Sequence, residues 1–154
     1  MPVERVFYCK KEDDTKKLAI EFAKIAKKGD VFALYGTLGV GKSCFSRYFI
    51  KQLSNVDDVP SPTFTLVQTY EADDFEIYHY DMYRLKAHEE AFELGIEDAF
   101  YDGVNLVEWP EKIASILPKN IWKITINVEG GVRVFRVECF VEEKKKRLEQ
   151  IVYE

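Results

Sequence analysis

Apolar positions along the chain follow two different periods, which predicts a protein of mixed strands and helices. Short alternating or unbroken apolar runs are typical of strands, whereas apolar residues three and four positions apart are typical of amphipathic helices. We expect strands at 3–9, 31–35, 64–71, 75–80, 104–107, 122–128 and 132–140. We expect helices from 12 to near 27–29 and over 43–53, 89–100, 111–116 and 142–153.

Turn residues between these runs predict that part of the sheet is antiparallel. Asp73 and Asp74 separate two adjacent strands, and the segment Glu-Gly-Gly at 129–131 separates the last two. Both spacings are typical of hairpins. Prolines at 60 and 62 interrupt the chain after the second helix, because proline disfavours helix in itself and in the residue before it.

The composition is typical of one globular domain spanning 1–154. The chain has 47% hydrophobic and 32% charged residues and contains no linker, repeat or low-complexity segment. Its net charge of −5 argues against non-specific coating of nucleic acid. No apolar run reaches the roughly 18 residues of a membrane span, and the N-terminus lacks the apolar centre of a signal peptide. We therefore expect a cytoplasmic protein without membrane contact.

The cysteines, the basic run and the histidines are each expected to have structural rather than functional roles. Three cysteines without a C-x-x-C pair indicate reduced thiols in packing roles; they are Cys9, Cys44 and Cys139. The basic run at 144–147 is interleaved with glutamates, so we expect a solvated helix face rather than a nucleic-acid patch. His79 and His88 have no cysteine at ligand spacing, so no zinc site is expected, and His79 should be a packed or hydrogen-bonded strand residue.

The segment 36–43, Gly-Thr-Leu-Gly-Val-Gly-Lys-Ser, matches the phosphate-binding loop pattern G-x-x-x-x-G-K-[ST]. In such a loop, backbone N–H groups surround the phosphates, Lys42 reaches the β- and γ-phosphates, and the Ser43 hydroxyl ligates Mg²⁺. The loop lies between a buried strand and a helix, where the helix N-terminus favours anions. We therefore predict a P-loop NTPase-like three-layer α/β fold, with a mixed parallel and antiparallel sheet flanked by helices, that binds a nucleoside triphosphate.

Two carboxylates are candidates for the second metal-side position. Asp81 follows an aromatic strand and Glu108 follows an aliphatic one, and sites in open α/β sheets gather at strand ends. Either residue could instead be a turn, capping or solvated strand-end residue. The residues alone do not separate their roles.

Four segments in this order resemble the TsaE family (formerly YjeE), small bacterial P-loop ATPases needed to make threonylcarbamoyladenosine on tRNA. They are the loop 36–43, Ser-Pro-Thr-Phe at 61–64, His-Tyr-Asp-Met-Tyr-Arg-Leu at 79–85 and Val-Glu-Trp-Pro at 107–110. The resemblance runs from about 15 to 137 and does not reach the charged C-terminal helix. Thr37 departs from the acidic residue usual in the family, and Val40 from its frequent alanine.

The resemblance implies a role for each matching residue. Lys42, Asp81 and Glu108 would be catalytic, and Ser43 would hold Mg²⁺ together with the two carboxylates. The segment 61–64 would respond to the γ-phosphate as a switch. The residues expected at the ATP are Gly36, Thr37, Leu38, Gly39, Val40, Gly41, Lys42, Ser43, Cys44 and Trp109.

The resemblance also implies an activity: a Mg-dependent ATPase that acts on and resets the TsaB–TsaD complex, with tRNA contacted only through that complex. No arginine occupies an obvious finger position, and lacking one costs about 10³–10⁵ in rate. We therefore expect slow hydrolysis alone and faster hydrolysis with partners. Two alternatives stay open, a small-molecule kinase and an ATP-binding interaction module; a GTPase is disfavoured because the chain lacks an N-K-x-D stretch.

Overall fold

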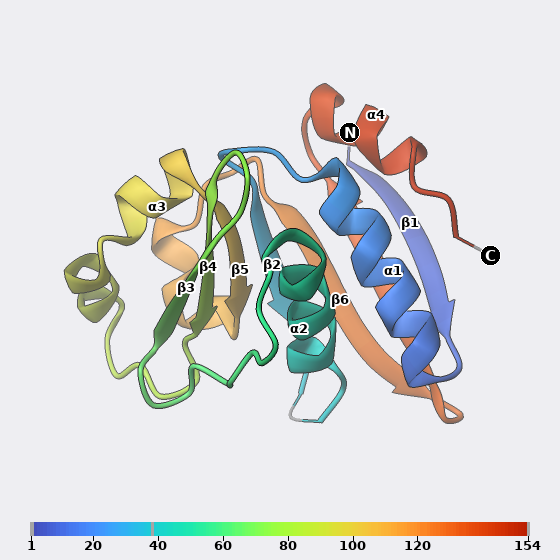
Figure 1. Ribbon diagram of the computed structural model, residues 1–154, viewed down its shortest axis with the longest axis horizontal. Helices are drawn as coiled ribbons and strands as arrows, with labels where there is room; N and C mark the ends of the chain where they lie inside the picture. Colours follow the sequence, from blue (N-terminus) through green and yellow to red (C-terminus); the bar gives the residue numbers. More distant parts are fainter. Residues whose placement is uncertain (1, 38, 154) are drawn as a thin grey trace.

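The computed structural model describes residues 2–37 and 39–153 and shows helices on both faces of a mixed sheet (Figure 1). The strands in this part of the chain are β1 (Val3–Cys9), β2 (Val31–Tyr35), β3 (Val67–Glu71), β4 (Glu76–Asp81), β5 (Val104–Glu108), β6 (Trp122–Glu129) and β7 (Val132–Cys139). The helices are α1 (Glu12–Ile25), α2 (Lys42–Leu53), α3 (Ile96–Asp102) and α4 (Glu142–Glu149), with 3-10 segments η1 (His88–Leu94) and η2 (Pro110–Ile116).

The strand order is β1-β7-β6-β2-β5-β4-β3. The centre of the sheet is parallel, because β2 lies between β5 and β6 and β4 pairs with the other side of β5. The edges are antiparallel, formed by the β3–β4 and β6–β7 hairpins and by β1 against β7. This arrangement confirms the predicted α/β fold and brings the carboxyl ends of β2, β4 and β5 to one edge of the sheet.

Strand β2 explains why each face of the sheet carries a helical layer. Phe32 and Leu34 pack in a cluster with α1 and α2, whereas Val31 and Ala33 pack in a second cluster with η1, α3 and η2. Successive strand residues point to opposite faces, so an unbroken apolar strand must be covered on both. Phe22 of α1 is fully buried in the first cluster. Its ring meets other aromatic rings edge-on, namely Phe7, Phe32, Phe45 and Trp122.

The predicted strand 64–71 is wrong over its first three residues. The Leu66 N–H donates to the Pro62 carbonyl at 2.6 Å, and Leu66 has a positive φ of 69°. Residues 62–66 therefore form a turn, and β3 begins only at Val67. The turn directs Thr63 toward β4 and leaves Phe64 82% exposed.

The predictions of single regular helices at 89–100 and 111–116 are also wrong. The predicted helix 89–100 is divided at Gly95, whose φ of 71° lies in the left-handed region, where glycine is favoured. The 3-10 segment η1 ends before this glycine and α3 begins after it. The predicted helix 111–116 is the 3-10 segment η2, interrupted at Ile113.

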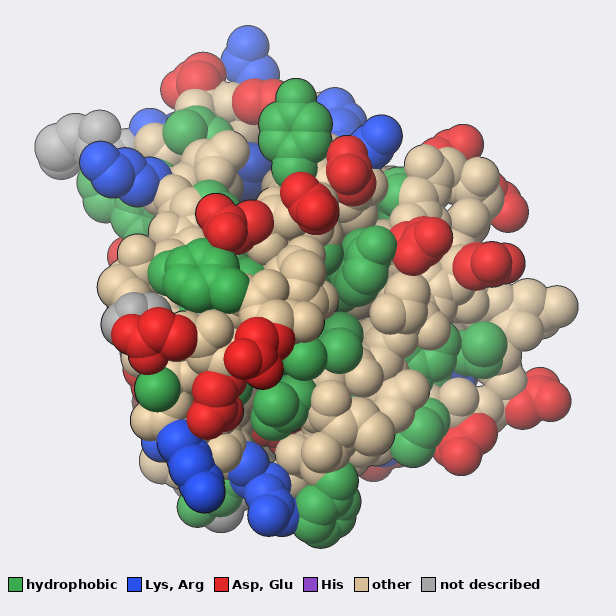
Figure 2. All heavy atoms as spheres, turned by 90° about the vertical axis from the view of Figure 1, so that its left-hand side faces the viewer, with side chains coloured by type: hydrophobic (Ala, Val, Ile, Leu, Met, Phe, Trp, Pro, Cys, Tyr) green, Lys and Arg blue, Asp and Glu red, His purple; other side chains and the backbone are tan. Residues whose placement is uncertain are grey.

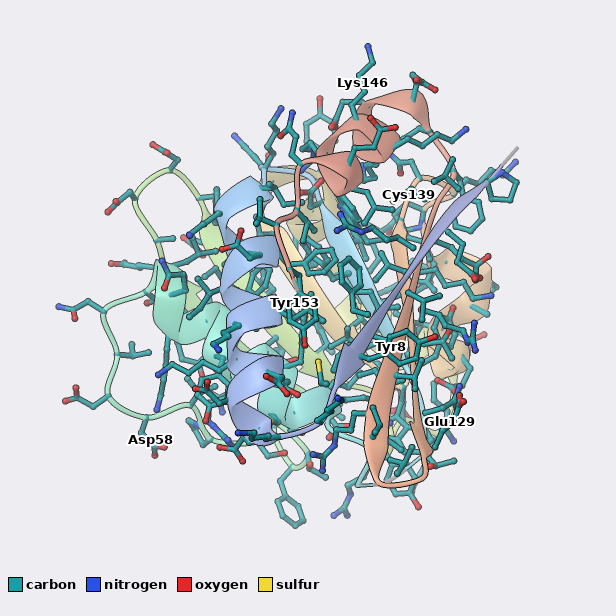
Figure 3. All side chains as sticks on the ribbon, turned by 90° about the vertical axis from the view of Figure 1, so that its right-hand side faces the viewer. Tyr8, Asp58, Glu129, Cys139, Lys146 and Tyr153 are labelled. Atoms are coloured by element: carbon teal, nitrogen blue, oxygen red, sulfur yellow. The ribbon has the colours of Figure 1, made fainter. Side chains whose placement is uncertain are left out.

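The C-terminal helix ends at Glu149, four residues earlier than the predicted 142–153. The chain then continues beside β1 (Figure 3), where the Tyr153 hydroxyl donates to the Tyr8 carbonyl at 2.7 Å. Arg5 Nη1 holds the same segment by donating to the carbonyls of Leu148 and Ile151. Tertiary contacts with β1 therefore replace the last helical turn.

The expectation of a solvated helix face at 144–147 is wrong for the two ends of this basic run. Lys144 and Arg147 are each only 5% exposed, because the buried carboxylate of Asp30, just before β2, pairs with both. Lys146 alone of the run is fully on the surface.

The side formed by β3, η1 and α3 shows acidic side chains among apolar ones (Figure 2). Arg84 and Lys86 are the only Lys or Arg residues between 71 and 102. Such a surface lacks the dense Lys and Arg side chains with which proteins bind nucleic-acid phosphates. None of the helices in the described residues is both long and apolar enough to cross a membrane.

Candidate functional site

The glycine loop connects the carboxyl end of β2 to α2, as the sequence predicts. Gly36, Gly39 and Gly41 have φ values of 149°, 81° and 113°, a region that favours glycine. A Cβ on Gly36 would lie 2.7 Å from Val40 Cγ2 and 2.8 Å from the Ile126 carbonyl oxygen. The backbone of the loop therefore follows a tight path that leaves no room for a side chain at Gly36.

Arg133 of β7 ties the loop to the sheet. Its Nε donates to the Val40 carbonyl at 2.9 Å, and a Cβ on Gly41 would lie 3.0 Å from the same nitrogen. Val40 is buried, so this departure from the family's alanine is a packing residue.

The other loop positions play different parts. Thr37 is exposed and Leu38 lies outside the described residues. Cys44 is half-buried, and burial raises the pKa of its thiol.

Lys42 folds back on its own loop. Its Nζ donates to the Gly36 carbonyl at 2.5 Å and lies 3.4 Å from the centroid of the Trp109 ring. Burial lowers the pKa of the Lys42 ammonium, and the Glu108 carboxylate partly opposes this shift. Trp109 has a left-handed φ of 59°, uncommon for a bulky residue. Among the described residues, the partners given for the ammonium are thus a neutral carbonyl and an aromatic ring, neither of which carries the negative charge of a phosphate oxygen.

Ser43, Glu108 and His79 form a chain of polar contacts that runs from the exposed Ser43 to two buried side chains. The Ser43 hydroxyl donates to Glu108 Oε1 at 2.9 Å, and Glu108 Oε2 lies 2.5 Å from His79 Nε2. Glu108 and His79 are 2% and 1% exposed. They come from neighbouring strands, β5 and β4. Sequence reasoning did not assign His79 to the site, although strand alternation places it on the same face of β4 as Asp81.

Asp81 connects the turn at 62–66 to the end of β4. Its Oδ2 accepts a hydrogen bond from Thr63 Oγ1 at 2.8 Å, and its Oδ1 accepts one from the Tyr83 N–H at 3.0 Å. The strand register places Asp81 opposite Glu108. The structure therefore brings both predicted carboxylates to adjacent strand ends, but it gives a contact with Ser43 only for Glu108.

The donor set at these strand ends suits Mg²⁺. Ser43, Asp81 and Glu108 offer only oxygen atoms, which are the ligands that Mg²⁺ prefers. Among the described residues, no three His, Cys, Asp or Glu side chains are grouped to hold a metal. A metal here would fill its remaining positions with water and phosphate oxygens, as Mg²⁺ does at nucleotide sites.

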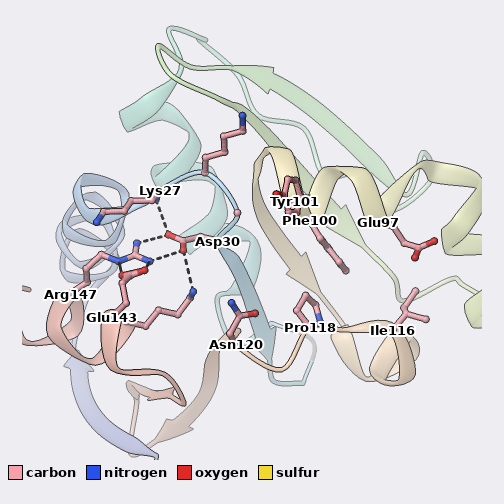
Figure 4. Close-up of a pocket in the computed structure, with 13 residues that line it drawn as sticks. Lys27, Asp30, Glu97, Phe100, Tyr101, Ile116, Pro118, Asn120, Glu143 and Arg147 are labelled. Carbon is pink, nitrogen blue, oxygen red and sulfur yellow. Dashed lines mark hydrogen bonds and ion pairs between the residues drawn. The ribbon is translucent and has the colours of Figure 1, made fainter.

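A cavity of about 790 Å³ lies at the other end of the parallel strands and contains none of the predicted site residues (Figure 4). The ion pair between Asp30 and Arg147 lines one side of this cavity. The Arg147 guanidinium also donates to the Glu143 carboxylate and the Ile25 carbonyl. These groups satisfy one another, so the cavity alone does not indicate a site.

Comparison with known proteins gives one consistent answer. A model of the family "Threonylcarbamoyl adenosine biosynthesis protein TsaE" matches residues 9–134. The TsaE protein of Rickettsia conorii is 45% identical over 120 residues, covering 77% of this chain and 67% of that protein. The TsaE protein of Bacillus subtilis is 39% identical over 119 residues, covering 77% and 74%. The crystal structure of Bacillus subtilis YdiB has a TM-score of 0.84 at 29% identity, covering 98% of this chain and 95% of that one.

The sheet order and the glycine loop after β2 place the chain among the P-loop-like α/β proteins. Within this class, the chain belongs to the TsaE family of tRNA threonylcarbamoyladenosine biosynthesis proteins. The resemblance inferred from the four motifs is therefore confirmed. The matched residues include the loop, both strand-end carboxylates and His79.

Proposed function

We propose that the protein is a cytoplasmic, Mg-dependent ATPase that serves threonylcarbamoyladenosine formation on tRNA. The observation that carries the proposal is the 2.9 Å contact between Ser43 Oγ and Glu108 Oε1. P-loop proteins hold Mg²⁺ between this serine and a strand-end carboxylate, beside the β- and γ-phosphates. Membership of the TsaE family supports the pathway.

Each residue then has a task in positioning ATP. The loop amides and Lys42 bind the phosphates, and Lys42 exchanges the Gly36 carbonyl for phosphate oxygens. Ser43 and Glu108 would hold Mg²⁺, which supplies charge neutralisation on the β- and γ-phosphates when bound. Asp81 would orient a water near the γ-phosphate or share the metal. Its hydrogen bond to Thr63 would couple the presence of the γ-phosphate to the conformation of the 61–64 segment.

Slow turnover by the isolated protein is part of the proposal. Arg133 bonds to the Val40 carbonyl, and the Arg84 guanidinium lies 4.7 Å from the Phe64 ring. No described contact brings either guanidinium to Ser43 or Glu108. We propose that the TsaB–TsaD complex orders or completes the site, and that ATP hydrolysis resets that complex between turnovers.

Hydrolysis of Mg-ATP by the purified protein, alone and with TsaB, TsaD and tRNA, tests this function. We expect little activity alone and a clear rise with the partners. Glu108→Ala should remove the stimulated activity. Fast hydrolysis indifferent to the partners would contradict the proposed biology, and phosphate transfer to a small molecule would indicate a kinase. Pathway activity retained by a Glu108→Ala variant without ATPase would indicate an interaction module.

A further inference from the structure

His79 is a buried histidine to which the proposed ATPase chemistry assigns no task. It lies in β4 and is 1% exposed. Its Nε2 lies 2.5 Å from Glu108 Oε2, whereas its Nδ1 has no hydrogen-bond partner among the described residues. The only hydrogen bond described for the ring therefore goes to the carboxylate that also contacts the P-loop serine.

This contact fixes the orientation of the Glu108 carboxylate. The terminal torsion of a glutamate is broad, so a single contact leaves its oxygens poorly defined. Here His79 holds Oε2 and the Ser43 hydroxyl holds Oε1. Whichever of the two groups donates, the 2.5 Å contact ties Oε2 to the His79 ring. With Oε2 occupied by a rigid ring on the neighbouring strand, Oε1 is directed at Ser43.

We propose that His79 is a positioning residue for the metal site, which presents Glu108 Oε1 to the cation held with Ser43. The proposal rests on the proposed function, because it concerns the same Mg-nucleotide site. Groups that orient a metal-binding side chain commonly change metal affinity by ~10- to 100-fold when removed.

Asn105 provides a matched control on the strand that carries Glu108. It is also fully buried, and its amide donates to the carbonyls of Ala99 at 2.8 Å and Asp30 at 3.3 Å. These acceptors are backbone atoms near the opposite end of β5. Asn105→Leu therefore removes buried hydrogen bonds without touching Glu108, and it separates loss of stability from loss of metal positioning.

The test measures binding of a fluorescent non-hydrolysable ATP analogue as a function of Mg²⁺ concentration. We expect His79→Leu to raise the Mg²⁺ concentration at half-saturation by ~10- to 100-fold and to leave analogue binding in EDTA unchanged. His79→Gln, whose amide can take the place of Nε2, should recover most of the wild-type response, whereas the shorter His79→Asn should not. Asn105→Leu should lower the melting temperature without changing the Mg²⁺ response.

Unchanged Mg²⁺ dependence in folded His79→Leu would overturn the proposal. Should that variant fail to fold, equal Mg²⁺ dependence in His79→Gln and His79→Asn would overturn it instead. A wild-type protein that binds the analogue without any response to Mg²⁺ would contradict the proposed function itself, which distinguishes the two failures.

Discussion

The two ends of strand β2 hold buried charges in opposite ways. At its start, Asp30 accepts two hydrogen bonds from Arg147 at 2.6 and 2.8 Å and one from the Lys27 N–H at 2.8 Å. Beyond its end, Lys42 has one backbone carbonyl and the face of the Trp109 ring. Both cations are buried, 5% exposed for Arg147 and 4% for Lys42.

The pKa shifts of the two cations differ in sign because their partners differ. Burial alone lowers the pKa of Arg147, but hydrogen bonds to Asp30 and Glu143 outweigh it and raise that pKa. Burial lowers the pKa of Lys42, and the nearby carboxylates do not compensate. The start of β2, with Asp30 and Arg147, is therefore a saturated end, where the charged groups pair with one another and stabilise the fold. The other end of β2, with Lys42, is an open end, where the ammonium can exchange its partners, as ligand binding requires.

The largest expected effect is on stability, at the saturated end. Arg147→Ala removes both guanidinium hydrogen bonds of the buried Asp30 carboxylate and leaves Lys144, at 3.6 Å, as its remaining cation. Breaking a buried pair costs about 3–5 kcal/mol. Urea unfolding should show this loss, while ATP affinity of the folded variant stays at the wild-type value. The exposed neighbour Lys146→Ala is the control and should change stability by no more than about 0.5 kcal/mol. If Arg147→Ala lowered ATP affinity as much as stability, the two ends of β2 would not have separate roles in folding and in binding.

Lys42→Ala should have the opposite effect, with lower ATP affinity and nearly unchanged stability. Hydrogen bonds to charged groups contribute about 1.5–3 kcal/mol, so we expect ATP affinity to fall by about 10- to 100-fold. Its unfolding free energy should change little, because the contacts given for Nζ are one backbone carbonyl and the face of the Trp109 ring. Calorimetric titration measures the affinity, with the exposed Lys51→Ala on the same helix as control. Undiminished ATP binding by Lys42→Ala would place the phosphates elsewhere.

A smaller effect is expected at the turn beside Asp81. Thr63→Val removes the hydroxyl that donates to Asp81 at 2.8 Å, a contact of about 0.5–1.5 kcal/mol. We expect partner-stimulated hydrolysis to slow by a few-fold with ADP affinity unchanged. Thr65→Val is the matched control, since the contacts given for the Thr65 hydroxyl among the described residues are the Pro62 carbonyl and Gln68. Equal slowing in both variants would indicate a general disturbance of the turn.

The smallest expected effects concern two thiols, Cys139 near Arg147 at the saturated end and Cys44 beside Ser43 at the open end. Burial raises the pKa of Cys139, near Arg147, from 9.0 to about 12. The unfolded thiol therefore loses its proton at a lower pH than the folded one, so this group makes the unfolding free energy fall as pH rises from about 9 toward 12. At pH 8, iodoacetamide should modify half-buried Cys44 before Cys139, and Mg-ATP should slow the reaction at Cys44. Mass spectrometry that shows Cys139 modified first would contradict this order.

Local patterns predicted the open end of the molecule well. The glycine loop has a fixed spacing in the sequence, and strand periodicity places Asp81 and Glu108 at strand ends. Parallel pairing of β4 with β5 then brings the carboxylates together. His79 was missed because its contact with Glu108 crosses from one strand to the next, which no motif on one strand reveals.

The saturated end could not be predicted from local patterns. Asp30 and Arg147 are 117 residues apart, and Arg147 lies in a run whose composition is typical of a solvated helix. The turn at 62–66 and the break at Gly95 escaped prediction for a related reason. Apolar residues and helical periodicity continue through both, while single backbone conformations at Leu66 and Gly95 decide the path.

The most direct test of the account maps where nucleotide binds, by amide chemical shifts of labelled protein titrated with a non-hydrolysable Mg-ATP analogue. We expect the largest shifts in the loop 36–43, at 61–66, and at the strand ends 81–83 and 108–109, with little change around Asp30 and α4. Shifts concentrated at Asp30, Lys144 and Arg147 would contradict the account, because they would place the ligand in the cavity at the saturated end.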